Sequence, residues 1–368
     1  MKTTFLLAIG LAAASAAVAV AQAPTPANLQ APQDPRYAEI VAKCKMPPAG
    51  AQPRGGGAAP GREGGAARGG AAGQGRGAAP AAAPASTEYT VSEIPGVIAA
   101  GQRWTSVYQT TGNNADGLIA ADDGGLLIAQ NDNGVVLKLD RNNQTSVAYR
   151  DTNTGGALSQ NAKGAMFVAS RGINTSVLQL APQRRVFANR YQGEPFECIG
   201  GVLNDLSADS RGGVYFTMGG VYYADAKGNV TSYGKDLRTN GVILSTDEKT
   251  LYVTNGQVVV AFDVQPDGSL ANQRDFAKLP MGGGDGMAVD AAGRLYVTAG
   301  GGGGGAPGVH VFAPDGKHLG HIPSPRNLIT VAFAGPDKKT LYAVANDRVR
   351  VDVYSIPMIA QGPKGRGK

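Results

Sequence analysis

The sequence contains few of the residues on which many enzyme classes depend. Its 368 residues include two cysteines, three histidines and one tryptophan. Cys44 and Cys198 do not form the closely spaced pairs of structural zinc sites, and no Gly-x-Ser-x-Gly nucleophile motif is present. Beyond the N-terminal region no run of about 18 apolar residues occurs, so we expect no transmembrane segment in the mature chain.

The net charge of +6 does not indicate a nucleic-acid-binding domain. Lys2, the Gly-rich segment 47–86 and the basic tail 359–368 carry +7 between them, which leaves −1 for the remaining sequence. The basic residues therefore lie in segments without the composition of a folded domain. We expect no nucleic-acid partner.

Residues 1–21 have the three parts of a signal peptide. Lys2 is the charged start, residues 5–14 form an apolar run, and Ala19, Val20 and Ala21 form a small-residue cleavage site. A core helix is the alternative, but prolines follow within a few residues. The pattern predicts export, with a periplasmic or secreted mature protein.

The next two segments precede the domain. Residues 22–46 are interrupted by prolines and allow one short helix over 35–45. Residues 47–86 are mainly Gly, Ala, Pro and Arg, which cannot bury enough apolar surface to offset the entropy of ordering, so we expect a disordered linker. In an oxidising compartment Cys44 and Cys198 can pair and tie the N-terminal segment to the domain, or they can stay free thiols.

Residues 87–358 consist of short β-like runs separated by Gly, Asp and Asn turns, and one unit of this texture occurs six times. The copies are anchored at Leu127, Phe167, Tyr215, Tyr252, Tyr296 and Tyr342, in steps of 40, 48, 37, 44 and 46 residues. Such a period, with about four short strands per copy, is typical of propeller blades. We therefore predict an all-β fold, a six-bladed β-propeller, in which residues 104–109 supply an outer strand to the last blade. A β-sandwich would not need six matched copies.

Two conspicuous patterns are interpreted as structural. The glycine run 300–305 follows one strand and leads to another, whereas a phosphate-binding loop needs a helix there. His310, His318 and His321 lie around a turn at residues 314–316. We interpret them as solvated surface histidines of a hairpin rather than as a metal site.

Short polar side chains stand just before the first strand of four repeats. They are Asp116, Asn204 followed by Asp205, Asn240, and Asp285. In a propeller this position lies at one end of the innermost strand, so residues distant in sequence converge near the axis. Carboxylate and amide oxygens suit a hard divalent cation such as Ca²⁺ or Mg²⁺. Asn-Gly and Asp-Gly are also ordinary turn formers, but four copies at one phase of the repeat favour a site.

The segments that begin at Asn204, Thr239 and Gly284 resemble, in this order, the motifs of the senescence-marker-protein/gluconolactonase/luciferin-regenerating-enzyme family. The resemblance covers most of residues 110–356. It implies a six-bladed propeller with one divalent metal in the central tunnel, and lactone hydrolysis among the activities of the family.

By this resemblance, Asn240 and Asp285 match the metal-binding Asn and Asp of the family, and Asp285 also matches its proposed general base. Asn204 matches the substrate-side Asn, which in some members reaches the metal, and Asp205 follows it as in the family. Asp116 stands where the family usually has a metal-binding Glu.

Two further positions depart from the family pattern. Val202 stands where sugar-lactone members carry an Arg, and Thr330 where an Asn is common. These departures argue against a specific sugar-lactone substrate more than against the metal.

With the signal-peptide pattern, the resemblance implies an exported hydrolase of lactones or related esters with one divalent cation, Ca²⁺ before Mg²⁺, Mn²⁺ or Zn²⁺. We expect a monomer. Water activated by the metal would attack the ring ester, while the metal stabilises the developing oxyanion. A carboxylate beside a cation has a lowered pKa and is a poor base, so the metal and Asp285 would share the activation. The alternatives are a non-catalytic propeller that binds a ligand or protein partner with a structural metal, and an enzyme of another reaction type.

Overall fold

The structure is a computed structural model that describes residues 29–45, 89–300, 306–347 and 350–365. The signal peptide expected over residues 1–21 and the disordered linker expected over residues 47–86 lie outside the described residues. No helix in the described part of the chain is long and apolar enough to cross a membrane.

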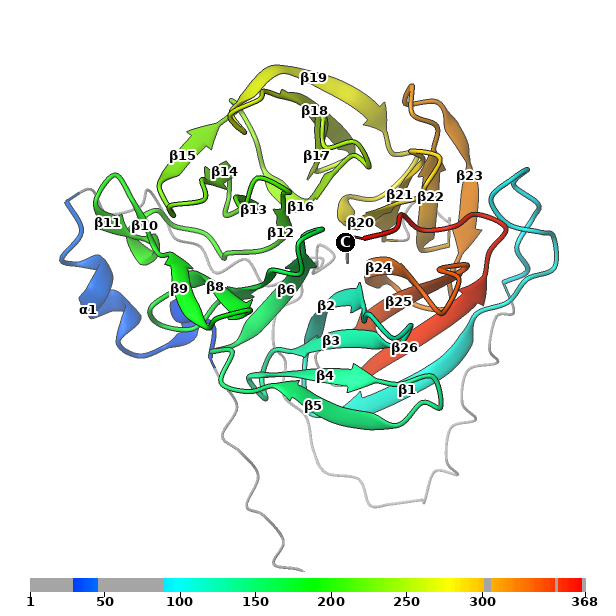
Figure 1. The fold of residues 1–368 in the computed structure, drawn as a ribbon, viewed down its shortest axis with the longest axis horizontal. Coiled ribbons are helices and arrows are strands. Elements are labelled where there is room, and N and C mark those ends of the chain that lie inside the picture. The colour runs from blue at the N-terminus through cyan, green and yellow to red at the C-terminus, as the bar shows by residue number, and fades with distance from the viewer. Residues whose placement is uncertain (1–28, 46–88, 301–305, 348–349, 366–368) are drawn as a thin grey trace, which may run out of the picture.

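Six four-stranded antiparallel sheets surround a central axis as the blades of a β-propeller (Figure 1). In each blade the first strand is innermost and the fourth is outermost. The predicted all-β, six-bladed fold is therefore confirmed. The predicted site residues lie on or next to the innermost strands, so these strands position them.

The strands of the first three blades have the following bounds. Blade 1 contains β2 (Ala115–Ala120), β3 (Leu126–Gln130), β4 (Val135–Leu139) and β5 (Thr145–Tyr149). Blade 2 contains β6 (Gly155–Gln160), β7 (Met166–Ser170), β8 (Ser176–Ala181) and β9 (Arg185–Ala188). Blade 3 contains β12 (Leu206–Ala208), β13 (Val214–Thr217), β14 (Val221–Ala224) and β15 (Val230–Tyr233).

The other three blades complete the ring. Blade 4 contains β16 (Thr239–Leu244), β17 (Thr250–Asn255), β18 (Val258–Val264) and β19 (Leu270–Lys278). Blade 5 contains β20 (Gly284–Val289), β21 (Leu295–Ala299), β22 (Gly308–Phe312) and β23 (His318–Pro323). Blade 6 contains β24 (Leu328–Ala334), β25 (Thr340–Asn346), β26 (Arg350–Pro357) and β1 (Thr105–Thr111).

The six repeat anchors all lie on the second strand of a blade. Every residue of β3, β7 and β21 is buried, because both faces of a blade pack against its neighbours. Tyr296 of blade 5 meets Phe333 of blade 6 edge-on, with ring centroids 5.0 Å apart. The outer strand β5 is mostly exposed. Burial on both faces explains why the inner strands appear in the sequence as continuous apolar runs rather than as alternating patterns.

The ring is closed by a strand from the start of the domain. β1 pairs antiparallel with β26, from Thr105 opposite Ser355 to Thr111 opposite Arg350. At this seam Asp352 is fully buried and accepts hydrogen bonds from Gln109 of β1 (2.9 Å) and from Arg350. The outer strand expected at residues 104–109 is confirmed and begins at Thr105.

The N-terminal segment packs beside blades 2 and 3. It contains a 3₁₀ turn η1 (Ala31–Gln33) and the helix α1 (Tyr37–Val41), which lies within the predicted residues 35–45. Between blades 2 and 3 lie the hairpin β10 (Arg190–Tyr191) and β11 (Glu194–Pro195) and the turn η2 (Phe196–Cys198). Cys44 and Cys198 form a disulfide with their Cα atoms 5.5 Å apart. Of the two alternatives open from the sequence, the structure has the paired one.

The interpretation of the three histidines as solvated is wrong for His310. His310 lies on β22, one strand in from the blade edge, and only 2% of it is exposed. Its ring stacks on His321 with centroids 4.5 Å apart, and its Nδ1 lies 3.1 Å from Nε2 of His318. Burial, together with the two neighbouring imidazoles, lowers the pKa of His310 to about 4. The cluster is a neutral packing element.

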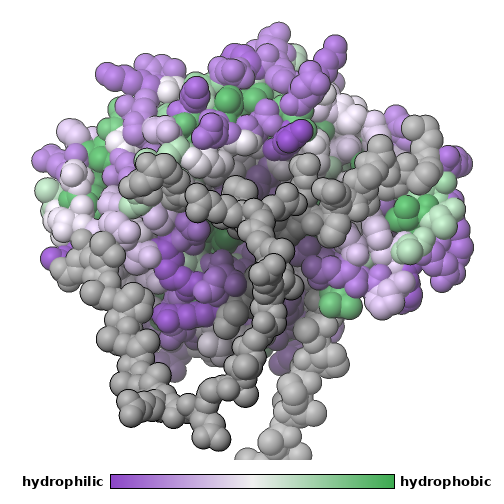
Figure 2. Space-filling view, turned by 180° about the vertical axis from the view of Figure 1, so that it is seen from behind, coloured by the Kyte–Doolittle hydropathy of each residue, from purple (hydrophilic) through white to green (hydrophobic). Residues whose placement is uncertain are grey.

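The described surface visible from behind the view of Figure 1 is mainly hydrophilic, with small separate apolar patches (Figure 2). The large hydrophobic side chains that are exposed are scattered over the molecule, at Leu29, Val147, Val186, Leu319 and Ile359. Apolar surface is thus buried mainly between the blades.

Candidate functional site

The innermost strands share an irregularity at one position. Their pairing with the second strand shifts register within β2, β6, β16, β20 and β24. In β2, β16 and β20 the shift spans Asp116, Asn240 and Asp285 respectively. A β-bulge re-aims the side chain at the point where the ladder is interrupted. The bulges therefore direct the predicted site residues into the space around the axis.

A glycine follows each of these three residues because the neighbouring inner strand passes very close. A Cβ on Gly241 would lie 2.3 Å from the backbone oxygen of Asp285, and one on Gly117 would lie 2.2 Å from that of Gly156. Gly241 and Gly117 lie within strands and have no left-handed φ. The alternative that these Asn-Gly and Asp-Gly pairs are turn formers is therefore wrong.

The polar residues predicted for the site line one pocket with about 320 Å³ of empty space, part of it open to solvent. The members expected from the sequence are Asp116, Asn204, Asp205, Asn240 and Asp285. Thr330 also lines the pocket, whereas Val202 does not. The convergence expected from the phase of the repeat is thus present, while the roles of these residues as ligands, base and substrate contacts stay predictions.

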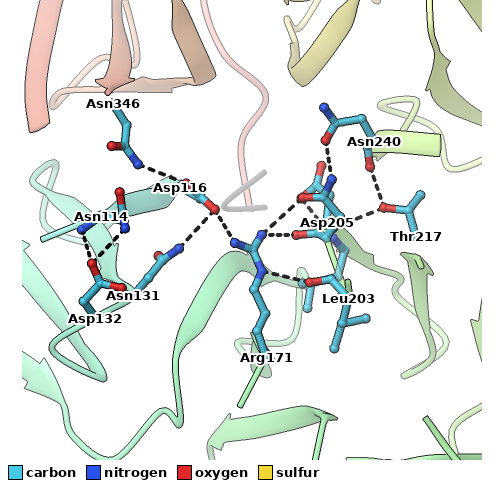
Figure 3. A network of polar contacts seen from close by, with 12 residues as sticks. Asn114, Asp116, Asn131, Asp132, Arg171, Leu203, Asp205, Thr217, Asn240 and Asn346 are labelled. Atoms are coloured by element: carbon cyan, nitrogen blue, oxygen red, sulfur yellow. Dashed lines mark hydrogen bonds and ion pairs between the residues drawn. The ribbon is translucent and has the colours of Figure 1, made fainter. Parts of the chain in front are cut away.

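Arg171, which directly follows β7, lines the same pocket and was not predicted from the sequence (Figure 3). Its side chain is 3% exposed, and its Nη1 forms an ion pair with Asp116. Its Nε donates to the carbonyl oxygen of Leu203 (2.8 Å), and its Nη2 donates to the backbone oxygen (2.5 Å) and the Oδ1 (3.2 Å) of Asn204. The guanidinium therefore joins the site residues of blades 1 and 3.

A second phase of the repeat supplies the partners of Asp116. Arg171 stands four residues after its anchor Phe167, and Asn131 and Asn346 stand four residues after theirs. Asn131 donates to Oδ2 of Asp116 (3.0 Å) and Asn346 to its Oδ1 (3.5 Å). The sequence signal that could have identified Arg171 is this common spacing.

In the other three blades the same phase holds glycine. The equivalent positions in blades 3, 4 and 5 are Gly219, Gly256 and Gly300. A Cβ on Gly219 or on Gly256 would meet nothing within 4 Å. Side chains at this phase therefore extend from blades 6, 1 and 2, whereas the glycines at this phase in blades 3, 4 and 5 contribute none.

The charges of the site favour an added cation. Burial, together with the carboxylates of Asp116 and Asp205, raises the pKa of Asp285 to about 8, and Arg171 and Asn240 only partly offset this rise. Burial also opposes ionisation of Asp116, but the charge and hydrogen bond of Arg171 outweigh it and lower the pKa of that carboxyl. Asp285 thus lies in an excess of negative charge that one guanidinium does not neutralise.

Asp205 has a different environment from the other acids. It is 7% exposed, and its two oxygens accept from the backbone N–H of Leu206 (2.9 Å) and of Val242 in β16 (2.9 Å). Its carboxylate thereby connects blades 3 and 4. Next to it, Nδ2 of Asn204 donates to Oδ1 of Asn240 at 2.5 Å, which holds these two amides together.

The donor set fits a hard cation with few charged ligands. The carboxylates of Asp116 and Asp285 and the amides of Asn204 and Asn240 line one pocket, so the ligand atoms that they offer a cation are oxygens. In the described residues the one group of three His, Cys, Asp or Glu ligand atoms within 4.8 Å of one another is Cys44, Glu194 and Cys198, which contains the disulfide. A cation at the axis would therefore depend on amides as well as carboxylates.

Comparison with known proteins agrees with the motifs. The chain is 28% identical over 225 residues to a gluconolactonase of Zymomonas mobilis, covering 50% of this chain and 59% of that protein. It is 29% identical over 239 residues to lactonase drp35 of Staphylococcus haemolyticus, covering 58% of this chain and 70% of that protein. The chain thus spans 59% and 70% of the lengths of these two curated relatives.

The fold also occurs in solved structures. The calcium-binding protein regucalcin from Agrobacterium tumefaciens superposes with a TM-score of 0.57 at 18% identity, covering 70% of this chain and 94% of that one. At this identity the match supports the fold alone. Residues 115–346, which run from the first bulge to the last partner of Asp116, match the SMP-30/Gluconolactonase/LRE-like region. The family expected from the motifs is confirmed, and the chain belongs to the SMP-30/gluconolactonase/LRE-like family.

Proposed function

We propose that this protein hydrolyses lactones or related esters with the help of one divalent cation. The observation that carries the proposal is the convergence of Asp116, Asn204, Asn240 and Asp285 on one pocket, where burial and crowding of the carboxylates raise the pKa of Asp285. Two curated relatives are named gluconolactonase and lactonase, which supports the substrate class.

Each residue of the pocket has its own proposed role. Asp116, Asn204, Asn240 and Asp285 would hold the cation, which supplies Lewis-acid chemistry at the ester carbonyl when bound. Asp285 would help to remove a proton from the attacking water, and because a bound cation lowers the pKa of its carboxyl, it would share that activation with the cation. The Asn204–Asn240 amide pair would orient the ester, and Asp205 would fix the distance between the blades that carry this pair.

The oxygen-only donor set favours Ca²⁺ before Mg²⁺, Mn²⁺ or Zn²⁺. The similarly folded regucalcin of Agrobacterium tumefaciens is described as calcium-binding. A propeller that binds a ligand without hydrolysing it is the second candidate. One observation favours it, namely that Arg171 already neutralises Asp116 and thereby occupies one of the two carboxylates.

A lactone panel with and without chelator tests the proposal. We expect the purified full chain to hydrolyse at least one small lactone, to lose at least about 99% of that rate in chelator, and to regain it with Ca²⁺, because several kcal/mol of charge stabilisation would be removed. Rates are measured by acid release at constant pH. Hydrolysis that chelator leaves intact would exclude the cation, and cation binding without turnover of any lactone would support the second candidate.

We also propose that the chain is exported to the periplasm or secreted. The signal-like residues 1–21 and the Cys44–Cys198 disulfide both support this, since disulfides persist mainly in oxidising compartments. Fractionation of expressing cells tests the proposal. A mature N-terminus at Gln22 outside the cytoplasm is the expected result, and full-length protein confined to the cytoplasm would contradict it.

A further inference from the structure

Residues 29–45, here called the N-terminal clamp, dock on the loop that carries Arg171. The backbone N–H of Ala31 donates to the carbonyl oxygen of Arg171 at 2.7 Å, and Ala31 is 3% exposed. The hydroxyl of Thr154, just before β6, donates to the carbonyl oxygen of Leu29 at 3.2 Å. The start of the clamp therefore fixes the backbone of the residue whose side chain reaches the pocket.

The other end of the clamp is attached to the chain that leads to Asn204. Cys44 is bonded to Cys198 at the end of η2, and the hydroxyl of Tyr37 donates to the carbonyl oxygen of Glu197 at 3.4 Å. Lys45 adds an ion pair with Glu194 at 3.3 Å. Figure 1 shows α1, in blue, alongside this side of blades 2 and 3.

The two loops held by the clamp are also joined to each other. The buried carboxylate of Glu197 accepts from the backbone N–H of Thr175 at 2.9 Å. On the side of the pocket, the guanidinium of Arg171 donates to the carbonyl oxygens of Leu203 and Asn204. A closed circuit of contacts therefore runs from the clamp through Arg171 and Asn204 and returns through η2 and the disulfide.

The position of Arg171 is set on its other side by close packing. A Cβ on Gly156 of β6 would lie 2.0 Å from Cζ of Arg171, so the guanidinium rests directly on the inner strand of blade 2. A small displacement of the Arg171 backbone therefore moves the guanidinium along this strand and away from Asp116. The site depends on where the backbone of Arg171 is held.

The disulfide contributes to holding the clamp in its docked position. The clamp has more residues than it has hydrogen bonds to the propeller. The entropic cost of ordering one residue is about as large as the free energy that one hydrogen bond contributes, so these hydrogen bonds alone do not offset the cost of ordering the clamp. A covalent bond across 154 residues raises the effective concentration of the clamp at its docking surface.

We propose that the N-terminal clamp is a working part of the site, which positions Arg171 and, through it, Asp116 and Asn204. Arg171 is a positioning residue in this arrangement. The effect on turnover rests on the proposed lactone hydrolysis, whereas the effect on the order of the two loops does not.

Three variants of the full chain separate the parts of this proposal. Cys44→Ser removes the tether. Ala31→Pro removes the N–H that bonds to Arg171 and adds ring carbons at a buried position, while the preceding Gln30 already has the extended backbone that proline requires (φ −63°, ψ 146°). Lys43→Ala is the matched control, because Lys43 is exposed and its ion pair is with Glu39, which is itself a residue of the clamp.

Hydrogen exchange by mass spectrometry reads the order of the loops directly. We expect Cys44→Ser, or wild type treated with a reductant, to raise exchange at least about tenfold in residues 171–175 and 196–204. Ala31→Pro should raise it in 171–175 alone, and Lys43→Ala in neither. Unchanged exchange in both loops after loss of the disulfide would overturn the proposal, even if the protein hydrolyses no lactone.

Turnover tests whether the clamp acts through Arg171. In the wild-type background, we expect Cys44→Ser to lower kcat/KM for the best lactone at least about fivefold. In a protein that already carries Arg171→Lys, we expect the same substitution to lower kcat/KM less than about twofold, because the effects of residues that act as a unit are not additive. A clamp that merely stabilises the fold would give additive losses, which would overturn the positioning role. All rates are taken well below the melting temperature of each variant. No turnover in wild type would contradict the proposed function and leave the exchange result to decide this one.

Discussion

Replacement of Asp285 by Asn is expected to abolish lactone hydrolysis and at the same time to stabilise the cation-free protein. The activity is lost because the amide neither binds a cation as strongly nor accepts the proton of the attacking water. The stability rises because the variant no longer holds an ionisable carboxyl where burial and two other carboxylates oppose its charge.

The pH dependence of this stabilisation has a definite sign. The pKa of Asp285 is raised from 3.8 to about 8 in the folded protein, so between these values the unfolded chain has released the proton and the folded chain still holds it. Stability of the cation-free wild type therefore falls as pH rises from about 4 to about 8. One pKa unit corresponds to about 1.4 kcal/mol, which sets an upper limit of about 6 kcal/mol, and we expect a gain of at least about 1 kcal/mol for the variant at pH 8.

Thermal unfolding in chelator at pH 5 and pH 8 measures the effect. The melting temperature of Asp285→Asn should exceed that of wild type by more at pH 8 than at pH 5, and excess Ca²⁺ should raise the melting temperature of wild type only. Asp122→Asn, at an exposed carboxylate, is the control and should change neither value. An equal difference at both pH values, or full turnover by Asp285→Asn, would refute the assigned role.

Gly241→Ala is expected to be among the most damaging single-methyl additions in the chain. The new Cβ would lie 2.3 Å from the backbone oxygen, 3.1 Å from the carbonyl carbon of Asp285 and 3.2 Å from Cα of Gly286. These are backbone atoms of β20, which cannot rotate away, so blades 4 and 5 must separate. Overpacking of this kind costs about 1–3 kcal/mol and sometimes more; we expect about 3 kcal/mol or failure to fold.

Gly283→Ala provides the matched control two residues before Asp285. A Cβ there meets its nearest atom, the backbone oxygen of Gly256, at 3.8 Å, and the residue has no left-handed φ. We expect a change within about 0.5 kcal/mol in the free energy of unfolding by urea. If the two variants lost similar amounts of free energy of unfolding, close approach of the inner strands would not explain why a glycine follows the site residue in several repeats.

The fold could be predicted from the sequence because each blade repeats the same physical problem. Both faces of a blade are covered by its neighbours, which gives apolar second strands at regular steps, and Tyr215 and Tyr296 are fully buried at these positions. The closing strand could be placed as well, since a propeller ring must close. The burial of His310 could not, because a hairpin position does not reveal what packs on its face.

The site could be predicted in part for the same reason. Residues at one phase of a rotational repeat must converge, so Asp116, Asn240 and Asp285 were expected together and line one pocket. Arg171 lies at a different phase, directly after the second strand rather than on the first, and its long side chain bridges a distance that strand geometry alone does not specify. The pairing of Cys44 with Cys198 depends on how a segment outside the repeat docks, which periodicity does not address.

The glycines at the second phase have a consequence for the symmetry of the ring. Six copies of one unit would place six equal groups around the axis, yet at this phase three adjacent blades carry Asn346, Asn131 and Arg171 and the other three carry glycine. The repeat has thus diverged in two blocks of three. At this phase the side chains that contact Asp116 all come from one half of the ring, so a molecule at the axis would meet a different surface on each half.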